Sequence, residues 1–141
     1  MSRVKFSLPD NLPFSTKVRI RISDINYGGH LSNDRILTLA HDARIEFLKH
    51  YRFSEFDIGG TSMIMADAAI VFKSEGFHGD EVEVKMAASD FTRAGFNLYY
   101  KLVNLTTGTD LAYVKTGMVA FDYDTRKVMP VPDVFRQKCS A

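Results

Sequence analysis

The chain has only one cysteine among its 141 residues and no tryptophan. The single cysteine, Cys139, excludes an intrachain disulfide, so we expect a free thiol in a reducing, cytoplasmic setting. No apolar run approaches the roughly 20 residues that span a bilayer, and the first residues lack the apolar block of a secretion signal. Disulfide-stabilised and membrane-spanning classes are therefore not expected.

Neither sign of charge is in excess, because 18 basic residues are balanced by 17 acidic residues. This balance gives no electrostatic case for nucleic acid or a membrane surface as the main partner. The four histidines do not cluster with acidic residues at metal-ligand spacing, and Gly28-Gly29 alone is too weak a signal for a phosphate loop. Serine-triad signatures are also absent. We therefore expect neither a metal nor a cofactor.

Polar residues are concentrated in one stretch of the chain, between a predicted strand and a predicted helix. Residues 17–23 alternate polar and apolar, which predicts a strand with one buried face. Gly28-Gly29 then favours a turn, and a helix of apolar residues at helical spacing runs to about Tyr51. We expect Ser32 or Asn33 to cap this helix and Asp34 to lie in its first turn, where the helix dipole favours a carboxylate.

Four further strands are expected after the helix, at residues 62–74, 80–93, 96–106 and 110–123. Because the strands and the helix are segregated along the chain, the fold class is α+β with an antiparallel sheet. We expect one domain over residues 1–141, with an N-terminal arm at 1–13 and a C-terminal tail at 133–141. Residues 133–138 have the pattern of a short helix.

One face of such a sheet would pack against the helix. The other face must be exposed to solvent or covered by a partner. The candidate outer-face contacts are Met63, Met65, Tyr99, Tyr113 and Met118. Apolar and aromatic side chains on an uncovered face predict a homo-oligomer.

Four motifs in chain order carry a family resemblance. The strand ending in Asp24 is followed by Gly29-His-Leu-Ser-Asn33, and the helix contains Ala43-Arg-Ile-Glu-Phe-Leu48. Gly79-Asp-Glu-Val-Glu-Val84 opens a strand, and residues 124–132 form a turn that ends in Pro-Val-Pro. Together they resemble the 4-hydroxybenzoyl-CoA thioesterase-like branch of the hotdog-fold thioesterase superfamily.

The resemblance implies a hotdog fold, in which a five-stranded antiparallel sheet wraps around one long central helix. It implies an acyl-CoA thioesterase, which cleaves an acyl-CoA to free acid and CoA. It also implies a homodimer or homotetramer with sites at subunit interfaces.

Thioester hydrolysis needs a group that activates water and a group that stabilises the oxyanion. The resembling enzymes place a catalytic carboxylate four residues before the histidine of the Gly-His pair, and here that position is Asn26. A carboxamide donates hydrogen bonds but cannot act as a general base. Either His30 takes the proton, or another carboxylate replaces the missing one: Asp24, Asp34, Asp42, Glu46, or Asp67 from a partner subunit.

The expected catalytic residues are therefore Asn26, His30, Asp24 and Asp34. The expected substrate-binding residues are Tyr27, Gly29, Asn33, Asp67 and Arg93. Two other functions stay open: a non-catalytic or weakly catalytic acyl-thioester binder, and a hydratase or dehydratase, which the motifs support less well.

Overall fold

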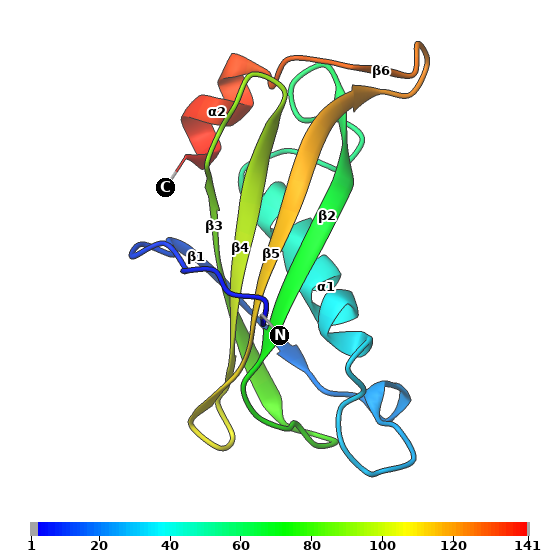
Figure 1. The fold of residues 1–141 in the computed structure, drawn as a ribbon, viewed down its shortest axis with the longest axis vertical. Helices are drawn as coiled ribbons and strands as arrows, with labels where there is room; N and C mark the ends of the chain where they lie inside the picture. The colour runs from blue at the N-terminus through cyan, green and yellow to red at the C-terminus, as the bar shows by residue number, and fades with distance from the viewer. Residues whose placement is uncertain (1–2, 141) are drawn as a thin grey trace.

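The computed structural model describes residues 3–140, in which one long helix lies against one face of an antiparallel sheet (Figure 1). The strands are β1 (Phe14–Arg19), β2 (Ser62–Phe72), β3 (Glu81–Ser89), β4 (Gly95–Asn104), β5 (Thr109–Asp122) and the two-residue β6 (Lys127–Val128). The helices are α1 (Arg35–His50) and α2 (Asp133–Cys139). The strand order is β1-β3-β4-β5-β2, and β6 pairs with β5. The expected order of strand, helix and four strands is confirmed.

The first strand is shorter than its alternating sequence predicts. β1 ends at Arg19, and Ile22–Asp24 form a single 3-10 turn in which Ile22 is 69% exposed. The carboxylate of Asp24 accepts a hydrogen bond from the Arg21 N–H at 2.9 Å, which turns the backbone out of the sheet. A side chain that binds the local backbone competes with strand pairing, so the prediction of a strand through residue 23 was wrong.

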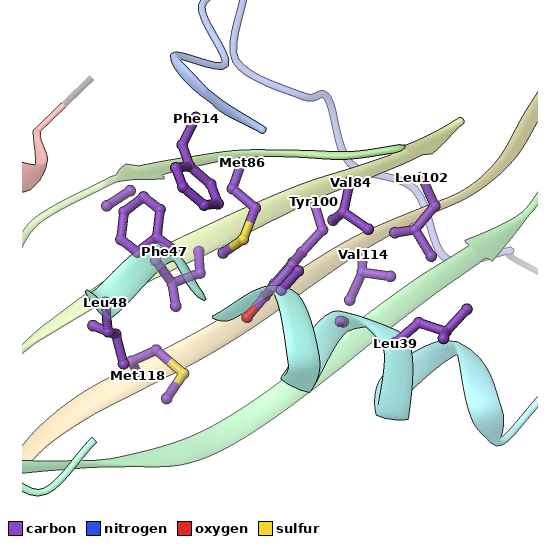
Figure 2. Packing of buried hydrophobic residues seen from close by; sticks show 14 of the residues in the cluster. Phe14, Leu39, Phe47, Leu48, Val84, Met86, Tyr100, Leu102, Val114 and Met118 are labelled. Atoms are coloured by element: carbon purple, nitrogen blue, oxygen red, sulfur yellow. The ribbon is translucent and has the colours of Figure 1, made fainter. Parts of the chain in front are cut away.

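The core lies between α1 and the inner face of the sheet (Figure 2). Phe47 on α1 packs edge-on against Phe14 of β1, with ring centroids 5.5 Å apart. From the central strands, Met86, Tyr100 and Val114 point toward the helix. An apolar helix face and an apolar sheet face must both be buried from solvent, and here each is buried against the other.

The outer face of the sheet is partly covered by the N-terminal arm, which crosses it on the side opposite α1 (Figure 1). Phe6 in the arm lies 6.2 Å from the ring of Tyr99. The expected set of outer-face contacts was partly wrong. Met63 and Met118 belong to the core, and Met65 lines a hollow with His41 and Arg44 on the helix side.

The C-terminal residues form the short helix expected there, α2. Phe135 is fully buried and packs against Phe96 with ring centroids 4.9 Å apart. Cys139 is 2% exposed, and burial raises the pKa of its thiol to about 12. The cysteine is therefore a small core residue, not an exposed thiol. Within residues 3–140, the helices are all too short or too polar to cross a bilayer.

Candidate active site

The loop between β1 and α1 is tied together by backbone hydrogen bonds. The Asn26 N–H donates to the His30 carbonyl at 3.0 Å, and the Ser32 N–H donates to the Asp24 carbonyl at 2.9 Å. The Leu31 N–H donates to the Gly76 carbonyl at 2.7 Å, which anchors the loop to the connection between β2 and β3. Gly29 has a φ of +86°, a backbone angle that side chains disfavour. The loop thus holds its polar groups in one conformation.

His30 is half-buried and has a defined tautomer. Its Nδ1 lies 3.0 Å from the Leu31 carbonyl oxygen, which can only accept a hydrogen bond. Nδ1 therefore carries the proton, and in the neutral ring Nε2 is left with a lone pair. A lone pair at Nε2 can accept a proton from water, which is what a general base must do.

Asn26 lies close to His30 on the other side of Gly28. Its Oδ1 accepts a hydrogen bond from the Gly28 N–H at 2.9 Å. A methyl group placed on Gly28 would lie 3.1 Å from Asn26 Oδ1 and 3.7 Å from His30 Nε2. The NH₂ group of Asn26 has no acceptor among residues 3–140, so it can donate to a bound ligand.

The start of α1 differs from the expected cap. Asp34 is the N-cap residue, and no side chain caps the helix. The Ser32 hydroxyl donates to the Asp34 carboxylate instead, and this hydrogen bond lowers the pKa of Asp34. The Asn33 N–H has no backbone acceptor within the described chain. An unpaired amide at a helix start is suited to a developing negative charge.

A hollow of about 260 Å³, here called the inner hollow, lies beside this helix start. His30, Leu31, Asn33 and Ile36 line one side. Residues 72–76 line the other side, and they include Lys73 and Glu75. Sequence reasoning missed Lys73 and Glu75, because only the Leu31–Gly76 contact brings them to the loop.

Several predicted site residues lie elsewhere. Asp24 is buried and lines a separate hollow with Arg21, Arg35 and Asp42 on the β1 side of α1. Tyr27 is fully exposed at the loop tip. The Asp67 carboxylate sits at a bulge in β2 and accepts a hydrogen bond from the Gly117 N–H at 3.1 Å.

Arg93 lies in the turn between β3 and β4, and Figure 1 shows this turn at the end of the sheet opposite the loop between β1 and α1, which carries His30. The nine residues of β3 separate the two ends by about 30 Å. Within one chain, the structure therefore joins His30, Asn26, Asn33 and Asp34 and leaves Asp24, Asp67 and Arg93 apart.

A polar network crosses the core beside the inner face of α1. The Arg44 Nε donates to Glu55 at 3.0 Å, and Nη1 donates to the Tyr100 hydroxyl at 3.2 Å. The Tyr100 and Thr116 hydroxyls lie 2.8 Å apart, and His41 contacts Glu55 at 3.0 Å. Burial of Glu55 raises its pKa, but hydrogen bonds from His41 and Arg44 outweigh this and lower it overall. Every buried side-chain polar atom of the described chain has a partner, so this network is fully hydrogen-bonded.

Within residues 3–140, no group of three or more histidine, cysteine or acidic side chains lies close enough to hold a metal ion. The polar side chains that line the inner hollow are those of His30, Asn33, Lys73, Ser74 and Glu75, and the Asn33 N–H lies at the same helix start. This set can activate water and stabilise an oxyanion.

Comparison with solved structures supports the hotdog fold. The chain matches a 1,4-dihydroxy-2-naphthoyl-CoA thioesterase from Synechocystis with a TM-score of 0.80 and 20% identity, over 89% of this chain and 93% of that one. It matches a DHNA-CoA thioesterase from Staphylococcus aureus with a TM-score of 0.77 and 20% identity, over 87% and 83% of the chains.

A further match is a Staphylococcus aureus protein in complex with CoA, with a TM-score of 0.79 and 16% identity, over 89% and 80% of the chains. These likenesses confirm the expected fold. A comparison with curated proteins found no match.

The sequence itself also matches a family model. The model describes a thioesterase-like superfamily, and the match covers residues 20–139, which includes the loop, α1 and the whole sheet after β1. This confirms the superfamily expected from the four motifs and supports the expected class of activity, thioester hydrolysis. The chain belongs to the thioesterase-like superfamily.

Proposed function

We propose that this protein is an acyl-CoA thioesterase, which converts an acyl-CoA and water to a free acid and CoA. The observation that carries the proposal is the inner hollow, where His30, the start of α1 and Glu75 line one space. Leu31, Ile36 and Phe72 supply its apolar wall, which suits an acyl group. The fold relative in complex with CoA supports CoA as the carrier.

In the proposed reaction, His30 Nε2 takes a proton from water while the water oxygen attacks the thioester carbonyl carbon. The carbonyl oxygen becomes an oxyanion, which accepts a hydrogen bond from the Asn33 N–H, while the Asn26 NH₂ group donates a hydrogen bond that orients the attacking water. The C–S bond then breaks, and the imidazolium returns its proton to the departing thiolate.

The remaining predicted residues take lesser roles in this proposal. Tyr27, Gly29 and Asp34 flank the loop and contact the part of the substrate outside the hollow. Asp67 and Arg93 are too far away along the sheet to act in the same chain, so they contribute only if a second copy brings them. Asp24 shapes the loop through its bond to the Arg21 N–H.

Hydrolysis is tested by mixing the purified protein with acyl-CoAs of varied chain length, including aromatic acyl groups, and measuring thiol release directly. We expect release well above the uncatalysed rate for at least one acyl class. Asparagine at position 26 favours a second candidate, a binder that does not hydrolyse. Saturable thermal stabilisation by acyl-CoA with no thiol release would support the binder and contradict the hydrolase.

We also propose a homodimer that pairs through β2. This strand is the last in the sheet order, so within the described chain its outer edge has no partner strand. It runs for 11 residues, and Met65 within it is 46% exposed. A long, exposed edge strand pairs readily with another chain. A homotetramer would require a second contact, and the outer sheet face is where it would form.

Ala66→Pro should weaken this dimer at least about tenfold, because proline removes an edge N–H donor and disfavours pairing. Sedimentation equilibrium would measure the dissociation constant, with the exposed Ala68→Ser on the same strand as the control. A wild-type protein that sediments as a monomer would contradict the proposal.

A cytoplasmic setting also stays a prediction, supported by the unbridged thiol of Cys139.

A further inference from the structure

A second and larger hollow lies on the outer face of the sheet, under the N-terminal arm. It has a volume of about 510 Å³ and is here called the outer hollow. The arm contributes Val4, Lys5, Phe6 and Ser7, and the sheet side contributes Val71, Lys73 and Tyr113. The proposed hydrolysis at the inner hollow makes no use of this space.

Two lysines, Lys5 and Lys73, are the charged residues that line the outer hollow. Within residues 3–140, neither Lys5 nor Lys73 has a carboxylate within salt-bridge distance. Lys85 and Lys101 occupy directly opposed positions on β3 and β4 of the same face. Like charges opposite each other destabilise a sheet, and only Lys85 has a nearby carboxylate, Glu83 at 3.9 Å. Lys5 and Lys73 therefore give the outer hollow two ammonium groups that can pair with an anion.

The walls of the outer hollow are aromatic. The Lys73 ammonium lies 5.0 Å from the centroid of the Tyr113 ring, and the Lys115 ammonium lies 5.7 Å from that of Phe6. The Tyr113 hydroxyl donates to Asp110, which holds the ring in place. Flat rings next to ammonium groups suit a ligand that combines an aromatic base with phosphates.

The outer and inner hollows meet at Lys73, which lines both. They lie on opposite sides of the end of β2, because Val71 lines the outer hollow and Phe72 lines the inner one. Successive side chains of a strand point to opposite faces. A ligand with a reactive end in one hollow and an anionic end in the other would pass over Lys73.

We propose that the outer hollow binds the phosphorylated adenosine end of CoA, with Lys5 and Lys73 contacting phosphate oxygens and Phe6 and Tyr113 contacting the adenine. The flexible pantetheine arm crosses the end of β2 and delivers the thioester to the inner hollow. The inference rests on the proposed thioesterase function and sharpens it, because the site would select CoA over carriers that lack the nucleotide.

Binding of adenosine 3′,5′-bisphosphate, measured by isothermal titration calorimetry, tests the site without catalysis. We expect wild-type protein to bind it and Lys73→Glu to weaken binding at least about tenfold, because an attraction becomes a repulsion. Lys5→Ala should weaken it several-fold, and the affinity should fall with added salt. The control is Lys49→Ala, at the far end of α1, which removes the same charge and should leave binding unchanged.

Two calorimetric results would overturn the inference. One is an affinity that Lys73→Glu leaves unchanged. The other is a loss of binding in Arg35→Ala, because Arg35 lines the separate cationic hollow on the β1 side of α1. Circular dichroism melts of each variant would show that the chain still folds.

Kinetics separate a failure of this inference from a failure of the proposed function. If the protein is a thioesterase, Lys5→Glu should raise KM for an acyl-CoA about tenfold more than KM for the matching acyl-pantetheine, which lacks the nucleotide. Equal effects on both substrates would overturn the nucleotide site. If neither thioester is hydrolysed but the bisphosphate binds in a Lys73-dependent way, the thioesterase proposal fails and the nucleotide site stands.

Discussion

Replacing Arg44 by alanine is expected to lower the free energy of unfolding by about 3 kcal/mol and Tm by about 10 °C. Arg44 is 8% exposed and bridges Glu55 on the loop after α1 to the buried Tyr100 of β4. Removing it leaves Glu55 with one partner fewer in a partly buried position. The loss is limited because Tyr100 keeps its bond to Thr116 and Glu55 keeps His41.

Urea unfolding followed by circular dichroism would measure this change. Glu46→Ala is the matched control, because it removes a charge from the exposed side of the same helix, where the pair with Lys49 is worth a few tenths of a kcal/mol. We expect the control to change stability by less than about 0.5 kcal/mol. If the free energy of unfolding of Arg44→Ala lies within about 1 kcal/mol of the wild-type value, the network contributes little to stability.

The same network predicts the direction of acid unfolding. The pKa of Glu55 is lower in the folded protein than in the unfolded chain, where the pKa of glutamate is about 4.3. Its contribution to stability is therefore fully present above that unfolded value, and it is lost as the pH falls through the folded pKa. Stability measured against pH should fall less steeply below about pH 4.5 in Glu55→Gln than in wild type.

Local patterns predicted the elements well and their faces less well. The apolar spacing on α1 and the turn residues between strands carried enough information to place a helix and four strands in the correct order. The alternation of polar and apolar residues continues through Ile22 and predicted too long a strand. The structure ends the strand earlier, because the Arg21 N–H donates to the Asp24 carboxylate and not to a neighbouring strand. Met63 and Met118 were assigned to the wrong face, since strand pairing decides the face and the sequence does not show it.

The candidate site was predictable only where its residues are close in sequence. Asn26, His30 and Asn33 could be grouped because one loop and one helix start carry them. Lys73 and Glu75 lie at least 40 residues later, and a tertiary hydrogen bond from Leu31 to Gly76 brings them to the same hollow. No pattern within the chain marks such a contact, and Glu75 looks like an ordinary loop residue.

His30→Ala is expected to lower kcat about 10²- to 10³-fold on the best acyl-CoA, with little change in KM. The neutral ring has one lone pair available, at Nε2, because Nδ1 is bonded to the Leu31 carbonyl. His30→Gln keeps a hydrogen-bonding side chain but cannot take a proton, so its kcat should fall nearly as far as that of His30→Ala. His41→Ala is the control, since that histidine is exposed on α1 and contacts Glu55 instead. A His30 variant with full turnover would exclude His30 as the base.

The substitution Asn26→Asp tests the same site, because we expect it to increase kcat. The change keeps the shape of the side chain, and the new carboxylate can still accept the hydrogen bond from the Gly28 N–H. It also provides the carboxylate that the resembling enzymes carry at this position, next to His30. We expect kcat to rise about tenfold or more if attack on the thioester is limiting. In the double variant Asn26→Asp, His30→Ala, the aspartate should restore part of the lost turnover, because either group alone can activate the water. A fall in kcat for Asn26→Asp would instead mean that the amide N–H donors of Asn26 are needed at the oxyanion, where a carboxylate would repel the developing charge.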